Sequence, residues 1–264
     1  MKLSKTLLAM SILVGVLVAP MSFMSPVKAV ANVDILSHNG YLDSFGYYHV
    51  VGEVQNVGDQ AVNFVKIEVV FYDSNNVDIA NRFDLTMLYV LLAGRKSPFD
   101  IVLLDTTQSA TVDHYELYVT FSQATSLPTN LVISTHSWYV DNDGNMHISG
   151  EIMNLGDNTA TNVKLVATYY NKAGNVVAAT SAYLDPIETN LDPGQTRPFD
   201  ILLSWDRTPY VDSYELTAES VEYALISVEH GVIPEFSAWG WVLVLSAMLA
   251  IVAVAWIHAK PSKH

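Results

Sequence analysis

The stretch HVVGEVQNVGD at residues 49–59 occurs a second time as HISGEIMNLGD at residues 147–157, 98 positions further along the chain. Downstream of it, PFDI at residues 98–101 returns at residues 198–201. Matches that keep their order over such a distance indicate an internal duplication. The repeating unit is too long for a solenoid, so each copy is predicted to form a small domain of its own.

Both copies show the hydrophobic period of β-strands. In residues 48–56, Val50 and Val54 fall on one face, while His49 and Glu53 fall on the other. We expect the first pair in the core and the second pair on a solvent-exposed face, which suits a wet sheet surface better than a metal site. Turn-forming clusters separate such segments at short intervals. The pattern predicts an all-β fold: two tandem immunoglobulin-like antiparallel β-sandwiches, flanked by an N-terminal signal helix and a C-terminal transmembrane helix.

The composition of the 264 residues restricts the class of protein. There is no Cys, so a disulfide, a thiolate metal site or a cysteine nucleophile cannot form. The formal net charge is −14, from 13 basic and 27 acidic residues, and that sign argues against nucleic acid as a partner. All of the acidic residues lie between Asp34 and Glu235, so the middle is anionic while both ends are basic and apolar.

The N-terminal residues 1–29 resemble a signal peptide. Lys2 and Lys5 precede an apolar run of about a dozen residues, which is too short to span a bilayer comfortably. Val27 and Ala29 suit the −3 and −1 positions of a signal-peptidase cleavage site after Ala29. We therefore expect export, with an uncleaved anchor as the alternative to cleavage.

An uncharged stretch predicts a transmembrane helix over residues 237–258. About 20 residues at a rise of about 1.5 Å cover roughly 30 Å, the thickness of the hydrocarbon of a bilayer. Trp239 and Trp256 suit the two interfaces, and Lys260 and Lys263 place the short tail in the cytoplasm. The acidic middle is therefore expected to be an extracellular ectodomain on the cell membrane.

Directly before this stretch stand Pro234, Glu235 and Phe236. A Pro-Glu-Phe motif, an apolar span and a short basic tail resemble the C-terminal sorting signals of archaeal surface proteins. The resemblance implies an archaeal envelope protein that an archaeosortase-like transpeptidase cuts at this motif and moves to a lipid anchor. A permanent single-pass anchor is the alternative, and in both cases the membrane is a partner.

The repeats themselves resemble the FxLYD domain of prokaryotic surface proteins. The shared pattern is V-x-G-E-x-x-N-x-G-D, then V-K followed by Y-D or Y-N, then P-F-D-I, and finally Y-E-L. Within the F-x-L-Y-D motif that gives the family its name, only Tyr72, Asp73 and Tyr170 match outright. The resemblance implies a small extracellular β-sandwich with no catalytic residues to carry over, and a related sandwich family would imply much the same.

These patterns divide the chain into six parts. They are a signal peptide at 1–29, an FxLYD-like β-sandwich at 30–124 (repeat 1), a second one at 131–226 (repeat 2), a linker with the Pro-Glu-Phe motif at 227–236, a transmembrane helix at 237–258 and a basic cytoplasmic tail at 259–264. The joint between the repeats, with Pro128, is predicted to be short and stiff.

Few residues suggest binding chemistry. Asp141, Asp143 and Asn145 resemble the opening of a calcium loop, but the acidic residue that closes such a loop is missing, and an Asp-Gly hairpin turn explains the stretch as well. Trp138 and Trp205 have no counterpart in repeat 1 and are candidates for a ligand surface, because exposed aromatic rings stack on apolar faces of ligands. No nucleophile elbow, phosphate loop or metalloprotease motif occurs, so we expect no enzyme, no catalytic residue and no cofactor.

The expected function is a non-enzymatic envelope protein that displays two β-sandwiches on a membrane or lipid anchor, in a structural or adhesive role. The alternative is an extracellular module that holds a glycan, Ca²⁺ or a partner ectodomain between the two domains, and a third is an enzyme or transporter accessory. A binding module should show an exposed aromatic or carboxylate cluster on one repeat only, because duplicated residues mostly report the fold.

Overall fold

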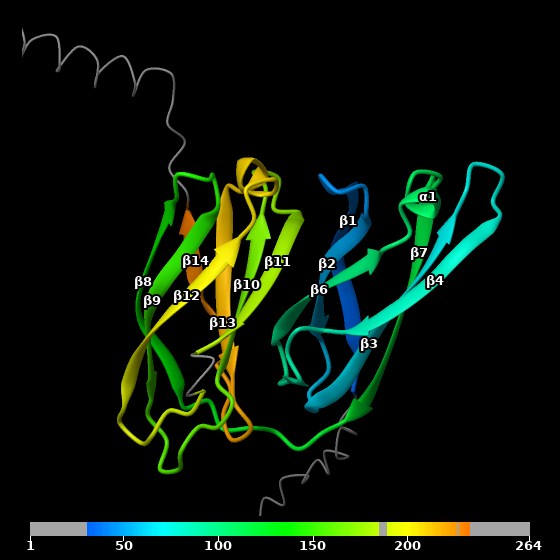
Figure 1. The fold of residues 1–264 in the computed structure, drawn as a ribbon. Helices are drawn as coiled ribbons and strands as arrows, with labels where there is room; N and C mark the ends of the chain where they lie inside the picture. The colour runs from blue at the N-terminus through cyan, green and yellow to red at the C-terminus, as the bar shows by residue number, and fades with distance from the viewer. Residues whose placement is uncertain (1–30, 185–188, 226, 233–264) are drawn as a thin grey trace, which may run out of the picture.

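The computed structural model describes residues 31–184, 189–225 and 227–232, and this part of the chain is built almost entirely of antiparallel β-sheets (Figure 1). The all-β prediction is therefore confirmed. No helix within the described ranges is long and apolar enough to cross a membrane. The predicted signal peptide, transmembrane helix, cytoplasmic tail and Pro-Glu-Phe motif lie outside the described residues.

Repeat 1 consists of two antiparallel sheets that enclose one core. The first sheet has the order β1-β2-β6, and in the second β3 pairs with β4, β5 and β7. A single helical turn, α1 (Thr106–Ser109), joins β6 to β7. The strands are β1 (Val33–Leu42), β2 (Tyr48–Asn56), β3 (Val62–Tyr72), β4 (Asp78–Leu85), β5 (Val90–Leu91), β6 (Lys96–Leu103) and β7 (His114–Gln123).

Repeat 2 has the same plan and also seven strands, with an isolated bridge between Ala160 and Leu191 in place of β5 and with β14 in addition. Its sheets have the orders β12-β9-β8 and β11-β10-β13-β14, and a 3₁₀ turn, η1 (Thr208–Tyr210), precedes β13. The additional strand β14 lies within the stretch 227–236 that was predicted to be a linker, and it extends the sheet by pairing with β13. The strands are β8 (Leu131–Val140), β9 (Met146–Asn154), β10 (Lys164–Tyr170), β11 (Val176–Tyr183), β12 (Thr196–Leu203), β13 (Ser213–Glu219) and β14 (Val228–Val232).

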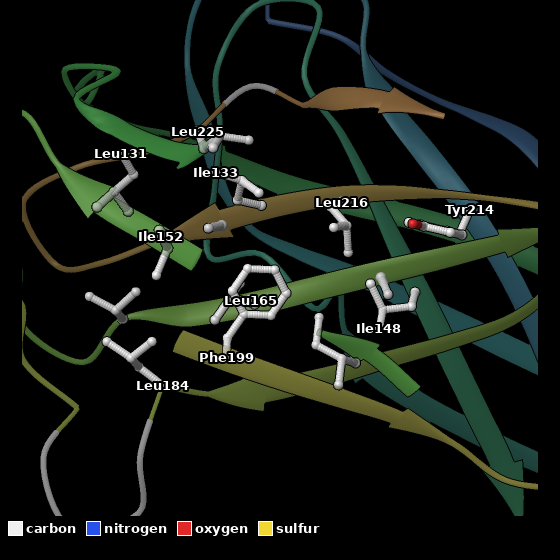
Figure 2. Packing of buried hydrophobic residues seen from close by; sticks show 14 of the residues in the cluster. Leu131, Ile133, Ile148, Ile152, Leu165, Leu184, Phe199, Tyr214, Leu216 and Leu225 are labelled. Carbon is white, nitrogen blue, oxygen red and sulfur yellow. The ribbon is translucent and has the colours of Figure 1, made fainter. Parts of the chain in front are cut away.

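Each core lies between the two sheets of its repeat. In repeat 2, Ile148 and Phe199 come from one sheet, and Leu165 and Leu216 come from the other (Figure 2). All four side chains are buried. Burial of aliphatic and aromatic side chains on this scale stabilises each sandwich by about 1.5–3 kcal/mol per side chain.

The repeated motif itself is structural. Asn56 donates its side-chain amide to the backbone carbonyls of Gln60 and Leu91, at 2.7 and 2.8 Å, and its side-chain oxygen accepts from the Gly58 amide. Asn154 makes the equivalent bonds in repeat 2. A buried amide that satisfies three backbone groups in each copy explains why the N-x-G-D stretch occurs twice.

The two sandwiches stack face to face, so the described chain has four layers (Figure 1). The order is β12-β9-β8, then β11-β10-β13-β14, then β1-β2-β6, then the sheet around β3. The two inner layers come from different repeats. The residues between them form an extensive contact between the repeats (Figure 1), and Ala61, Val90 and Leu92 of repeat 1 also pack with Ala224 of repeat 2.

Candidate functional site

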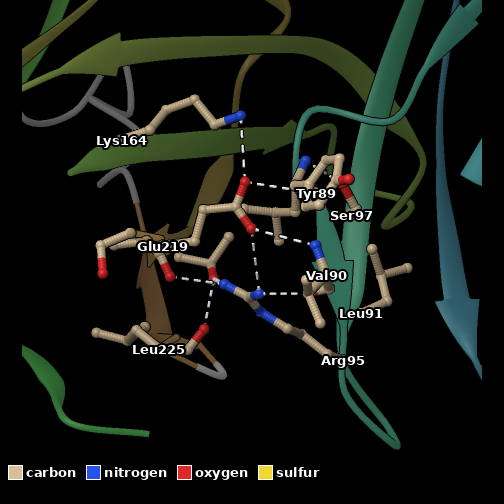
Figure 3. A network of polar contacts seen from close by, with 12 residues as sticks. Tyr89, Val90, Leu91, Arg95, Ser97, Lys164, Glu219 and Leu225 are labelled. Carbon is tan, nitrogen blue, oxygen red and sulfur yellow. Dashed lines mark hydrogen bonds and ion pairs between the residues drawn. The ribbon is translucent and has the colours of Figure 1, made fainter. Parts of the chain in front are cut away.

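The junction between the repeats is held by a buried ion pair. Arg95 of repeat 1 lies with Nη1 3.6 Å from Oε2 of Glu219 in repeat 2, and their side chains are 0% and 7% exposed (Figure 3). Arg95 donates to the carbonyls of Val90 and Ala218, each at 2.6 Å. Burial lowers the pKa of Arg95 to about 10 against the opposing effect of Glu219, so the guanidinium stays charged at neutral pH.

Glu219 in turn collects donors from both repeats. Its carboxylate accepts the backbone N–H of Tyr89 at 2.7 Å, and Lys164 Nζ lies 3.2 Å from it (Figure 3). A buried charge that lost these partners would be strongly destabilising. The pair therefore fixes how the two repeats meet.

An apolar cluster continues the junction. Val51 on the outer face of β2 packs with Tyr170, Val176 and Ala179 of repeat 2, and all four are buried. Val51 belongs to the face of β2 that also carries His49 and Glu53, on the side opposite Val50 and Val54. The expectation that this face is exposed to solvent is wrong, because repeat 2 covers it.

Glu53 shows this burial most clearly. It accepts a hydrogen bond of 2.6 Å from the Tyr170 hydroxyl, and Lys96 Nζ lies between it and Glu215, at 3.4 and 3.0 Å. Burial raises the pKa of Glu53, while Tyr170 and Lys96 act in the opposite direction. The pKa of Tyr170 is also raised, by burial and by the two carboxylates.

His49 stands at the other end of the same face, between two carboxylates. Its Nδ1 lies 2.9 Å from Asp100 and its Nε2 lies 3.5 Å from Asp43. Burial lowers the pKa of His49, but the two carboxylates outweigh that effect and raise it above its ordinary value. Tyr41 stacks on His49, and the guanidinium of Arg207 from repeat 2 lies 3.7 Å from the Tyr41 ring centre, a cation–π contact across the junction.

The same His–carboxylate cluster occurs in repeat 2, on the sheet face that does not meet the other repeat, and the His147 side chain is 14% exposed there. His147 lies 2.7 Å from Asp200 and 3.4 Å from Asp141, and Tyr139 stacks on it. The Asp200 hydrogen bond raises the pKa of His147. Because both repeats have this cluster, it belongs to the fold rather than to a site of one repeat.

Several residues at the junction differ in type from the residues at the equivalent positions of the other repeat, which lie on sheet faces that do not take part in the junction. Strand pairing aligns the two repeats residue by residue, so each junction residue has a counterpart on a sheet face that no other repeat covers. The junction has apolar or paired residues where the free face has polar ones: Val51 against Ser149, Val166 against Glu68, Val176 against Asp78, Ala179 against Asn81, Arg95 against Gln195 and Glu219 against Thr120. The repeats have thus diverged at these six positions of the contact, whereas Glu53 and Tyr170 have the identical counterparts Glu151 and Tyr72.

Beside the junction the two repeats form a groove. A cavity of about 360 Å³ is lined by Phe64, Leu85 and Tyr89 from repeat 1, and by Lys164 and Tyr183 from repeat 2, among others. A second hollow, of about 240 Å³, shares Tyr89, Lys164 and Tyr183 with the first. The two hollows therefore adjoin, and we call them together the inter-repeat groove.

The aromatic residues of the inter-repeat groove are exposed. Phe64, Tyr89 and Tyr183 are 51%, 48% and 57% exposed, and the Phe64 and Tyr89 rings meet edge to face with their centres 5.0 Å apart. Phe64 is replaced by Asn162 in repeat 2, and Tyr183 is replaced by Leu85 in repeat 1. Phe64 and Tyr183 are therefore each specific to one repeat, although the cluster that they form with Tyr89 is drawn from both repeats.

Phe64 also has a strained backbone. Its φ is +49°, and the equivalent Asn162 has φ +54°. Asn tolerates this left-handed conformation, whereas a bulky residue does not, and the cost is on the order of 1–3 kcal/mol. A strained aromatic residue that is half exposed is a pointer to function.

The predicted calcium residues are engaged in a turn. Asp141 Oδ1 accepts the backbone N–H groups of Asp143 and Asn145, at 2.9 and 2.8 Å, and its Oδ2 accepts from the Asn145 amide at 3.0 Å. Asp43 closes the equivalent turn of repeat 1 in the same way. No group of three or more ligating side chains that could hold a metal ion occurs in residues 31–184, 189–225 and 227–232. The hairpin-turn interpretation explains these residues.

The two predicted tryptophans have different surroundings. Trp138 packs against the core of repeat 2 and pairs with Ile148 on an inward-facing position. Its counterpart Gly40 has no room for a side chain, because Tyr48 fills that space, and Met146 replaces Tyr48 in repeat 2. Trp138 therefore fills the core volume that Tyr48 occupies in repeat 1, and it does not form a ligand surface.

Trp205 is 54% exposed and donates its backbone N–H to Asn145 Oδ1 at 3.0 Å. It lies beside the turn after β8, at the opposite end of the sandwich from the inter-repeat groove. The sorting-motif residues Pro234, Glu235 and Phe236 lie outside the described residues. The sequence did not point to Phe64, Tyr89 or Tyr183; the positions where aligned repeats differ in aromatic content were the available signal.

No protein-family model matches the chain, and no curated protein matches it. Among solved structures, it is similar to red sea bream transglutaminase, with 9% identity and a TM-score of 0.28 over 78% of this chain and 32% of that one. It is also similar to an exo-chitosanase of Amycolatopsis orientalis, with 12% identity and a TM-score of 0.28 over 76% of this chain and 26% of that one. A third similar structure is a calcium-binding mutant of Bacteroides uniformis beta-glucuronidase 2, with 12% identity and a TM-score of 0.31 over 75% of this chain and 28% of that one. The chain spans less than a third of each, and similarity at this level carries no argument about activity.

Proposed function

We propose that the chain is a non-enzymatic cell-surface protein that displays two immunoglobulin-like β-sandwiches as one rigid unit, in a structural or adhesive role. The observation that carries the proposal is the buried Arg95–Glu219 pair, which joins the repeats instead of leaving them on a flexible joint. A rigid unit of this kind can present a binding surface away from the cell or act as a spacer that holds two partners at a fixed distance.

The proposed anchor is the apolar stretch 237–258, with the FxLYD-like repeats outside the cell. Strand β14 ends at Val232, shortly before the Pro-Glu-Phe motif. In this proposal the sandwich stack stands close to the membrane, held either by the apolar span or by a lipid added after an archaeosortase-like enzyme has cut at the motif.

The test is fractionation of cells that produce the full chain, followed by treatment of intact cells with an external protease. The proposal expects the chain in the membrane fraction and cleavage from outside; an intact chain in the cytosol would overturn it. Mass spectrometry of the C-terminus separates the two anchors, because processing removes residues 260–264 and a permanent span retains them.

A second candidate function is ligand binding in the inter-repeat groove. The observation that favours it is the set of exposed aromatic residues that only one repeat has, with the strained Phe64 among them. A binding module and a displayed unit are compatible, since a surface protein can have both roles.

A further inference from the structure

We propose that the inter-repeat groove binds a neutral carbohydrate. The inference names the ligand class for the second candidate function and does not depend on how the chain is anchored. It rests on the aromatic walls of the groove, on its charge, on its size and on the divergence of the repeats.

Aromatic rings line both walls. Phe64 and Tyr89 come from repeat 1 and Tyr183 comes from repeat 2, and each ring is about half exposed. Aromatic faces bind the apolar C–H faces of sugar rings by stacking, while the hydroxyl groups at the rim of the sugar need polar partners. Ser181, which lies on β11 with Tyr183, lines the groove, and Asn162 lines the adjoining hollow.

The charge of the groove favours a neutral ligand. Its one cation, Lys164, is already paired with Glu219 at 3.2 Å, and Asp84 adds a carboxylate to the lining. The chain as a whole carries −14. A phosphorylated or acidic ligand would meet repulsion with no unpaired cation in the described lining to offset it.

The size of the groove favours a small ligand over a folded partner. The larger hollow, at about 360 Å³, falls in the range of roughly 300–1,000 Å³ that is usual for small-molecule sites. A stable protein interface needs about 800 Å² from each partner and a broad contact surface. A groove lined by aromatic rings from both repeats matches a chain of sugar rings better.

The test is isothermal titration calorimetry with the full chain in a detergent that has no sugar headgroup. The probes are linear oligosaccharides of glucose, mannose, galactose and N-acetylglucosamine, with an oligogalacturonate as the acidic comparison. We expect at least one neutral probe to bind, and Tyr89→Ala and Tyr183→Ala each to weaken that binding roughly tenfold. The control is Tyr139→Ala, which removes a ring that is 49% exposed on the free face of repeat 2 and should leave binding unchanged.

The substitution Phe64→Asn keeps the experiment informative should the tyrosine variants fold poorly, because it installs the residue that repeat 2 has at the same backbone conformation. This variant should fold and bind more weakly. Binding of none of the neutral probes, preference for the acidic probe, or unchanged binding in the Tyr89→Ala/Tyr183→Ala double variant would overturn the proposal. Cytosolic localisation would overturn surface display and leave this inference intact.

Discussion

Arg95 and Glu219, which are far apart in sequence and belong to different repeats, form a nearly solvent-free ion pair with a 3.6 Å separation. The guanidinium also donates to two backbone carbonyls, one from each repeat. In the other copy of the duplication the same two positions hold Gln195 and Thr120. The pair therefore belongs to the junction and not to the sandwich fold.

Replacement of Arg95 by Gln, the residue at the equivalent position of repeat 2, should lower the free energy of unfolding by about 3–5 kcal/mol, because it leaves Glu219 without its buried cation. Denaturant titration of the purified protein measures this change. Arg82→Gln is the matched control, since Arg82 is exposed on β4, and it should change the stability by less than about 0.5 kcal/mol. Equal effects of the two substitutions would show that the ion pair does not hold the repeats together.

The apolar part of the junction can be tested by exchanging residues between repeats. Val51→Ser removes a fully buried side chain from the junction and should cost about 1–3 kcal/mol of unfolding free energy. The reciprocal change Ser149→Val, on the free face of β9, should be nearly neutral. Thermal unfolding followed by circular dichroism gives both values, and a neutral Val51→Ser would contradict the packing of the two faces.

The strands of each sandwich could be predicted from sequence, while the junction could not. Alternation placed Val50 and Val54 in the core because period-two patterning reports which residues share a face. The same patterning cannot report what covers the opposite face, so His49 and Glu53 were expected in solvent. The signal was present in a different form: Val51 is apolar where its counterpart Ser149 is polar. Comparison of repeats, position by position, separates residues of the fold from residues of the contact.

The site was harder to predict than the fold for a related reason. The sequence suggests Trp138 as part of a ligand surface because repeat 1 has no tryptophan at that position. In the structure its ring packs against the core, where Met146 is smaller than its counterpart Tyr48. Phe64 lies in a segment that reads as an ordinary strand; its replacement by Asn162 in repeat 2 is the one signal in the sequence, while the case for function rests on its backbone conformation and its exposure. Neither property can be read from a single sequence.

The histidine clusters should make stability depend on pH. The folded state raises the pKa of His49 and of His147 above that of an unfolded chain, so their stabilising effect is complete below about pH 6.5 and is lost as the pH rises through the folded values. The melting temperature should therefore fall between pH 6 and pH 8, and the His49→Gln/His147→Gln variant should show a smaller fall. His114→Gln, which alters an exposed histidine, is the control. An unchanged pH profile in the double variant would contradict this role.

Removal of divalent cations should leave the structure as stable as before. The oxygens of Asp141 are engaged by backbone and side-chain donors of its own turn, so EDTA should not shift the melting temperature of the protein. Asp141→Ala should lower the melting temperature with or without Ca²⁺, and Asp43→Ala should do the same in repeat 1. A rise in melting temperature on addition of Ca²⁺ that Asp141→Ala abolishes would restore the calcium interpretation.

Phe64→Asn should not destabilise the protein. Relief of the left-handed strain is worth about 1–3 kcal/mol, which offsets the loss of an aromatic contact of about 0.5–1.5 kcal/mol with Tyr89. Chemical denaturation of the variant should give an unfolding free energy equal to or above that of the parent. A loss of more than about 2 kcal/mol would identify Phe64 as a residue that the fold itself requires.

The divergence of the junction from the free faces sets a limit on assembly. Two similar sandwiches that meet through two different faces form a heterologous contact. Such a contact propagates into fibres when every sandwich presents both of the faces that the contact joins. Here the outward copies of those faces carry Glu68, Asp78 and Ser149 in place of apolar residues. Growth thus ends at two modules, and molecules crowded at high density should stay separate from one another instead of polymerising.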